Sequence, residues 1–301
     1  MAGEQDGRIH VFLGKGGVGK TTCAAATAIH FADTGEDTLV LSTDPTPSLS
    51  HIFELEGRSR ERPILPHLWV TELGRDEVRA MWDEEFGREV YAVFSAFVEI
   101  EYQSFMSFMT SVLPGLNEEF MVDHIRRLAA RGRFRRIVWD TAPLGQTLAL
   151  LETPALLAEH LRLAPRVYSH LKASGEGRES VMQVLRRWDE LARTCMDFLR
   201  REVRFTMVTI AEALAVRQLE GVFGELERYG LGVGRLIINN VVTDPDSEFL
   251  RRKAEQQRPH LGLLRNRYRD CDPVTIPLFP GEIRGVDQLR QVAAVLHPTR
   301  R

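Results

Sequence analysis

The sequence predicts an α/β fold in which helices flank a doubly wound, mostly parallel sheet. Short apolar runs alternate with helical stretches along most of the 301 residues. Apolar strands separated by helices are typical of a parallel sheet that is covered on both faces. A glycine-rich loop directly follows the first apolar run, and the chain contains neither repeats nor a low-complexity linker. These observations favour one domain across residues 1–301.

The apolar runs give the expected strands in order. The first strand is expected at Ile9–Leu13, and the alanine-rich helix after the glycine loop at Lys20–Ala32. The later strands are expected at Thr38–Leu41, Leu68–Thr71, Arg136–Asp140, Phe205–Thr209, Leu236–Asn239 and Val274–Pro277. A turn or loop and then helical sequence follow most of them, as the alternation requires.

Two long helical stretches interrupt this alternation, at approximately 76–128 and 153–201. The first carries apolar side chains at helical spacing with few charges between them: Phe94, Phe97, Val98, Phe105, Phe108, Met109 and Val112, with Met81, Trp82, Met106 and Met121 nearby. Such a stripe is usually core, but soft methionine and phenylalanine side chains also suit a groove for apolar partners. Both interpretations stay open from the sequence.

Composition excludes several classes of protein. The chain is 44% hydrophobic and 27% charged, and its net charge of -3 argues against a nucleic-acid partner. The basic run Arg131–Arg136 is interpreted as a solvated rim. The 3 cysteines lie far apart and suggest neither a disulfide framework nor a zinc ribbon, which fits a reducing cytoplasm. The polar N-terminus is unlike a signal peptide, and no apolar run reaches the roughly 18 residues of a membrane span, so stable membrane insertion is not expected.

The glycine loop matches the pattern G-x-x-x-x-G-K-[ST] between a strand and a helix, which is the context that this phosphate-binding motif requires. Its backbone amides and the helix N-terminus would surround the phosphates. Lys20 is expected to reach the β- and γ-phosphates, and the Thr21 hydroxyl to bind Mg²⁺. The predicted nucleotide-binding residues of the loop are Gly14, Lys15, Gly16, Gly17, Val18, Gly19, Lys20, Thr21 and Thr22.

Lys15 is a second lysine, which such a loop does not normally need. Its position lets the side chain point away from its own phosphates and toward a nucleotide on a facing subunit. There it could stabilise charge on the transferring phosphoryl group, as an arginine finger does. The alternative is an exposed loop lysine without a role.

Two aspartates follow predicted strands. Asp44, in "STDPTPS", could orient or deprotonate the attacking water and contribute to the metal site, although Asp-Pro is also a common turn opener. Asp140 ends an apolar strand after a phosphate loop, which is the Walker B pattern, and should hold the Mg²⁺ shell, in part through water. Gly145 allows the following loop to hinge with the state of the γ-phosphate.

Together these residues resemble the deviant-Walker NTPases, and within that class the family of arsenite-pump ATPases and tail-anchored-protein targeting ATPases. The blocks "GKGGVGKTT", "STDPTPSLSHIF", "DTAPLGQTLALLETP" and "PLFPGEIRGVDQL" match the family in its order and extend over nearly the whole chain. The resemblance implies an ATP-dependent homodimer that uses Mg²⁺, with Lys15 reaching the partner's nucleotide. It also implies that Asp44 and Asp140 belong to two switch regions.

The resemblance assigns further residues to the nucleotide. It implies that Asn239 reads adenine, that Pro277, Leu278 and Phe279 pack on the base in a loop reaching Glu282, and that Glu212 touches nucleotide across the dimer. It also implies a hydrophobic helical client such as a tail-anchored membrane protein, bound on a helical apolar surface that opens and closes with nucleotide state.

The sequence departs from the family in three places. Thr46-Pro47 stands where the family commonly has Ala-His, and Gln146 where it usually has His. Eukaryotic targeting members carry a zinc-binding CxxC between the positions of Asn240 and Pro277, whereas this segment has the single Cys271, so zinc is not expected. Scattered cysteines also disfavour the alternatives, a metalloid-stimulated transport ATPase subunit and a metal-cluster or redox ATPase resembling the nitrogenase iron protein.

Overall fold

The structure, a computed structural model, describes residues 7–43, 47–57, 61–88, 91, 95, 99–106, 116–141 and 175–298. Contacts divide the chain into two compact units. The first comprises Met1–Gly74, Arg131–Gly145 and Glu202–Arg301, and the second Arg75–Ala130 and Gln146–Arg201. The single-domain organisation across residues 1–301 stays a proposal.

The first unit is built on a sheet of eight strands in the order β3-β4-β2-β5-β1-β6-β7-β8. Neighbouring strands pair in parallel except β3 and β4, which are antiparallel. The strands are β1 Ile9–Gly14, β2 Thr38–Ser42, β3 Arg62–Leu65, β4 Leu68–Glu72, β5 Arg136–Asp140, β6 Val203–Ile210, β7 Val233–Val241 and β8 Pro273–Pro277. The predicted α/β fold with a mostly parallel sheet is confirmed, and every predicted strand is present.

The edge strand β3 was not expected from the sequence. It is exposed along its first residues and contains Pro63, which cannot donate a ladder hydrogen bond. Proline is tolerated there because β3 pairs only with β4 among the described strands. A short, exposed strand with an internal proline lacks the apolar signal that identifies the other strands.

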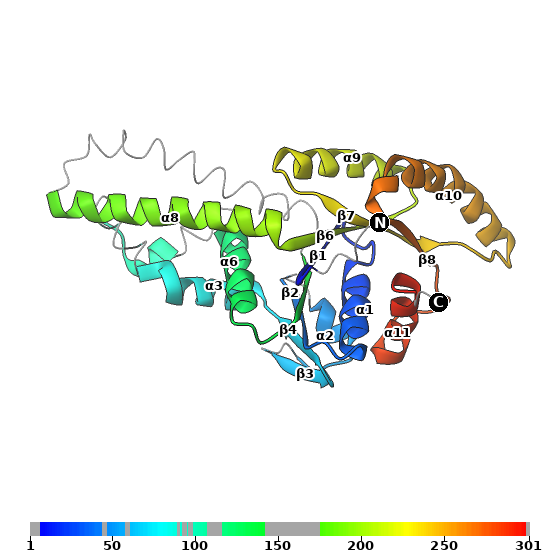
Figure 1. Ribbon diagram of the computed structural model, residues 1–301, viewed down its shortest axis with the longest axis horizontal. Coiled ribbons are helices and arrows are strands. Elements are labelled where there is room, and N and C mark those ends of the chain that lie inside the picture. Colours follow the sequence, from blue (N-terminus) through cyan, green and yellow to red (C-terminus); the bar gives the residue numbers. More distant parts are fainter. Residues whose placement is uncertain are drawn as a thin grey trace. The chain divides into compact units, whose positions relative to one another are not determined.

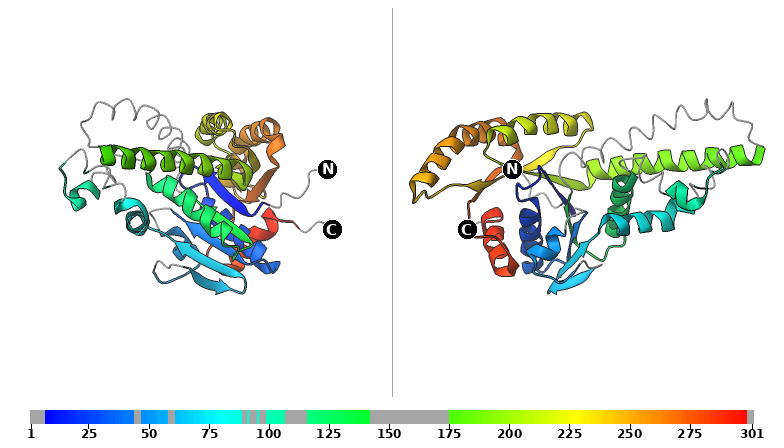
Figure 2. Two further views of the ribbon diagram at one scale, coloured as in Figure 1. Left: turned by 60° about the vertical axis from the view of Figure 1, so that its left-hand side comes forward. Right: turned by 180° about the vertical axis from the view of Figure 1, so that it is seen from behind.

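Helices cover the sheet of the first unit in two groups (Figures 1 and 2). Those of the first group are α1 Lys20–Asp33, α2 Ser48–Ile52 and α11 Gly285–Leu296, and they share one apolar core with the sheet. Those of the second group are α9 Ala213–Arg228 and α10 Glu248–Arg267, with the short helix η2 Arg269–Cys271. The buried side of α1 is largely alanine, which allows α11 and the sheet to approach closely.

The second unit is helical in its described part. It contains α3 Arg75–Trp82, the π-helical turn η1 Asp83–Gly87, α6 Leu116–Ala130 and α8 Gly175–Arg201. Helix α6 packs against both α3 and α8. The buried Asp123 carboxylate on α6 pairs with Arg126 and Arg127, and Arg127 also pairs with Glu85.

The described part of the apolar stripe is core. Trp82, Phe105, Met106 and Met121 are all buried, while Met81 is half-buried. The other members of the stripe, Phe94, Phe97, Val98, Phe108, Met109 and Val112, lie outside the described residues. The core interpretation therefore holds for the four buried side chains.

Candidate functional site

The phosphate loop joins β1 to α1 at the carboxyl edge of the sheet. A Cβ atom at Gly14 would lie 2.4 Å from the carbonyl oxygen of Val208, so β1 and β6 can approach here only with glycine. Gly19 caps α1 with φ of 95°, and its Cβ would lie 2.2 Å from the Nδ2 of Asn239. Both glycines are thus required by close contacts to β6 and β7 rather than by the turn alone.

The two lysines of the loop have different environments. Lys20 is buried, and its Nζ donates a 3.2 Å hydrogen bond to the carbonyl oxygen of Lys15. The ammonium of Lys20 is therefore bonded within its own loop, beside the place of the predicted phosphates. The side chain of Lys15, in contrast, is exposed to solvent.

Thr21 and Asp140 meet at the start of α1. The Thr21 hydroxyl donates to Asp140 Oδ2 at 2.8 Å, and the Ser42 hydroxyl lies 3.4 Å from the same oxygen. Asp140 is fully buried at the end of β5. A hydroxyl and a carboxylate brought together beside a phosphate loop are the hard oxygen ligands that Mg²⁺ prefers, so the residues present fit this ion.

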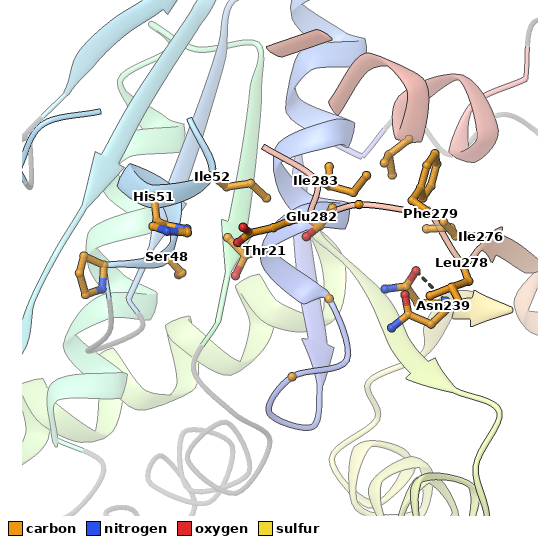
Figure 3. A pocket seen from close by; sticks show the side chains of 17 residues that line it. Thr21, Ser48, His51, Ile52, Asn239, Ile276, Leu278, Phe279, Glu282 and Ile283 are labelled. Atoms are coloured by element: carbon orange, nitrogen blue, oxygen red, sulfur yellow. Dashed lines mark hydrogen bonds between the residues drawn. The ribbon is translucent and has the colours of Figure 1, made fainter. Parts of the chain in front are cut away.

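A cavity of about 670 Å³ opens beside the phosphate loop (Figure 3). Figure 3 shows Ser48 and His51 of α2 on one side, Asn239 and Leu278 on the other, and Thr21 between them. The lining residues are Gly17, Gly19, Thr21, Thr22, Pro47, Ser48, His51, Ile52, Asn239, Asn240, Ile276, Leu278, Phe279, Gly281, Glu282, Ile283 and Val292. The cavity thus joins the phosphate loop to the segment predicted to hold the base.

Asn239, on β7, bonds directly to the phosphate loop. Its Nδ2 donates to the carbonyl oxygen of Val18 at 2.9 Å, and its Oδ1 accepts from the backbone N–H of Asn240 at 2.9 Å. The carboxamide is buried at 8% exposure yet lines the cavity. The predicted adenine reader therefore also holds the phosphate loop in place.

Apart from Glu212, the predicted site residues fall into three groups. Gly17, Gly19, Thr21, Thr22, Asn239, Leu278 and Phe279 line the cavity. Gly14, Lys15, Gly16, Val18, Lys20, Asp140 and Pro277 lie in the same loop and strand ends without lining it. Asp44 lies outside the described residues, as do Thr46, Gly145 and Gln146.

Glu212 is exposed where it precedes α9. Its N–H donates to the carbonyl oxygen of Ile210 at 2.9 Å. Its contact with nucleotide across a dimer stays a prediction.

Two buried polar residues of the site were not expected from the sequence. Glu72, at the end of β4, accepts from the N–H of Leu49 at 2.9 Å and from the Ser50 hydroxyl, and so holds α2 beside the cavity. Its position after an apolar strand is the signal that identified Asp140, and it could have identified Glu72. Gln257 on α10 bonds to the backbone that follows Asn239, and no sequence pattern marks it.

Two features are absent from the described part of the chain. Among those residues, no cluster of three or more histidine, cysteine, aspartate or glutamate side chains is arranged to hold a metal ion. No helix there is both long and apolar enough to cross a membrane.

Comparison with known proteins agrees with this geometry. The family model described as "Anion-transporting ATPase" matches residues 7–298. The protein named "Putative arsenical pump-driving ATPase 2" of Aquifex aeolicus is 29% identical over 302 residues, which cover 96% of this chain and 99% of that protein. "ATPase GET3C" of Arabidopsis thaliana is 27% identical, covering 94% of this chain and 80% of its own length. "ATPase GET3" of Clavispora lusitaniae is 29% identical, covering 97% and 90%. The chain therefore belongs to the anion-transporting ATPase family and is an ATPase.

Proposed function

We propose that this ATPase acts as a homodimer in the cytoplasm and couples its nucleotide state to the opening and closing of a helical apolar surface. The proposed client is a hydrophobic helical segment, such as that of a tail-anchored membrane protein. The observation that carries the ATPase part of the proposal is that one cavity brings together the phosphate loop, Asn239 and Thr21, whose hydroxyl bonds to Asp140.

The site residues have distinct proposed roles. An ATPase of this family uses ATP with Mg²⁺. Lys20 binds the β- and γ-phosphates, and Thr21 and Asp140 hold the metal ion, which when bound neutralises phosphate charge. Asn239 contacts the base beside Leu278 and Phe279, since a carboxamide can both donate to and accept from adenine. Asp44 orients the attacking water.

The part of the proposal that concerns the dimer rests on the contrast between Lys15 and Lys20. Lys20 is buried and bonded to its own loop, whereas Lys15 extends outward from the same loop. An exposed cation on a phosphate loop can reach the nucleotide of a facing subunit, as an arginine finger does. Each subunit would then be incomplete for hydrolysis although it binds ATP.

Fewer observations support the part of the proposal that concerns the client. Buried stripe residues such as Phe105 and Met121 pack inside the second unit and are not available to a client. A client surface must therefore come from other residues, for which 76–128 and 153–201 remain the proposed regions.

The alternative of a metalloid-stimulated transport subunit is suggested by the name of the Aquifex relative. It would need thiolate ligands, since arsenite and antimonite are soft. Cys23 and Cys195 are buried, and among the described residues the three cysteines do not form a cluster that could hold such an ion. This favours the client hypothesis over the metalloid one.

A subunit-mixing experiment tests the proposal. Lys15→Ala and Asp44→Asn subunits should each hydrolyse ATP at least about tenfold more slowly than the wild type. Mixed together they should recover part of the turnover, because one of the two composite sites regains both groups. Absence of recovery at every mixing ratio, with heterodimers demonstrated by a tag, would contradict the role of Lys15 across the dimer.

A trapping experiment tests whether client binding depends on the nucleotide state. A crosslinkable apolar helical peptide should bind the protein with a transition-state analogue and with ADP to different extents. Crosslinking that is indifferent to nucleotide would leave the ATPase assignment intact and contradict the coupling.

A further inference from the structure

The strand β7 is irregular where it meets the cavity. Its pairing with β8 shifts register between Ile238 and Val241, and Asn240 has φ of 56°. A non-glycine residue in this left-handed region is uncommon, and asparagine is one of the types that tolerate it. The bulge therefore needs specific hydrogen bonds to hold Asn239 and Asn240 at the cavity wall.

Four backbone groups of the bulge have identified partners. The N–H of Asn240 donates to Asn239 Oδ1, and the carbonyl oxygen of Val241 accepts from the N–H of Leu278 at 2.8 Å. The other two bond to one side chain: Gln257 Nε2 donates to the carbonyl oxygen of Asn240 at 2.8 Å, and Gln257 Oε1 accepts from the N–H of Val242 at 2.9 Å. One carboxamide thus spans Val241 from both sides.

Gln257 is unusual within its helix. Of the twenty residues of α10, all of them described, the buried ones are Gln257 and Leu264. Gln257 is 3% exposed, and a buried carboxamide is unfavourable unless its donor and acceptor are both bonded. Apolar packing of α10 needs no amide at this position, so the amide is explained by the bulge that it bonds.

We propose that Gln257 is a positioning residue for the nucleotide base: it fixes the Asn240–Val242 backbone and thereby aims Asn239 and Leu278 into the cavity. The inference rests on the proposed contact of Asn239 with adenine. It places base recognition partly on α10, which itself contributes no residue to the cavity lining.

The alternative is that Gln257 only attaches α10 to the sheet. Leu264 offers the matched control, because it is fully buried on the same helix without bonding to the bulge. Leu264→Ala should weaken the attachment of α10, and Gln257→Met should remove both hydrogen bonds at nearly constant volume.

The test measures ATP and GTP binding by calorimetry for the wild type, Gln257→Met, Leu264→Ala and Asn239→Ala, with urea unfolding as a check on folding. Wild-type protein should prefer ATP. Gln257→Met should weaken ATP binding about tenfold and GTP binding less than about threefold, so that the preference falls. Leu264→Ala should lower the urea midpoint and leave the preference within about twofold.

The outcomes separate the two claims. If Asn239→Ala lowers the preference for ATP and Gln257→Met does not, the role of Gln257 is overturned and the adenine contact stands. A preference that Leu264→Ala lowers as much as Gln257→Met would also overturn it, because attachment of α10 would then suffice. If Asn239→Ala has no effect, the adenine contact fails and the inference fails with it.

Discussion

The half of the cavity that we propose for the phosphates (the phosphate half) and the half that we propose for the base (the base half) are built differently. The phosphate half is one continuous segment, in which loop backbone, the buried Lys20 and the start of α1 are neighbours in sequence. The base half is assembled from β7, the loop after β8 and α10, through amide side chains that bond to backbone. The first half relies on charge and a fixed loop, and the second on neutral hydrogen bonds. Substitutions in the first should therefore have the larger effects.

The largest effect is expected at Lys20. Lys20→Ala removes a buried cation from the phosphate loop and should weaken ATP binding at least about 100-fold, which is about 2.7 kcal/mol. Calorimetry with ATP and Mg²⁺ measures it. Lys15→Ala is the matched control from the same loop and should keep ATP affinity within a few-fold of the wild type. Unchanged affinity in Lys20→Ala would contradict the loop assignment.

The junction of the two halves lies at Gly19, which has φ of 95° and touches Asn239. Gly19→Ala should lower the free energy of unfolding by about 2 to 3 kcal/mol, because it adds a clash to backbone strain. Gly17→Ala is the control: Gly17 also has positive φ, but nothing lies within 4 Å of its Cβ. It should cost about 1 kcal/mol, from strain alone. Urea unfolding compares them, and equal losses would show that the Asn239 contact contributes nothing.

Helices α1 and α11 also contact each other at their C-terminal ends, through two histidines. Helices α1 and α11 continue the phosphate loop and the base loop, and their ends meet where the His30 and His297 rings stack with centroids 4.2 Å apart. His297 also lies 3.2 Å from the Thr27 hydroxyl. Burial, with His30, Arg235 and His10 nearby, lowers the pKa of His297 to about 3. The folded state therefore keeps this imidazole neutral.

His297 is expected to make the folded protein less stable in acid. Below pH 6.5 the unfolded chain takes up a proton at His297 that the folded protein does not, so stability is complete above pH 6.5 and falls toward pH 3. At pH 5 the loss from His297 is about 2 kcal/mol. Urea unfolding at pH 7 and pH 5 should show a pH dependence about 2 kcal/mol smaller in His297→Gln. Leu296→Ala, beside it on α11, should lower stability equally at both pH values. An unchanged pH dependence in His297→Gln would contradict the claim that the neutral His297 destabilises the folded protein in acid.

The same contrast explains what could be predicted from the sequence. Local patterns were sufficient to predict the strand–loop–helix geometry around Gly14–Thr22, the parallel strands and the place of Asp140 at the end of β5, because each of these signals is local in the sequence. Glu72 carried the same signal as Asp140, a carboxylate after an apolar strand, and was overlooked. Gln257 gave no signal, because its partners Asn240 and Val242 are brought to it by the packing of α10 on β7.

Turnover measured against protein concentration tests the central claim most directly. If Lys15 completes the site of a facing subunit, ATPase activity per subunit should fall steeply once dilution separates the subunits, while ATP affinity stays constant. Lys15→Ala should show low activity per subunit at every concentration. Full wild-type activity per subunit in a solution shown to contain monomers alone would contradict the account.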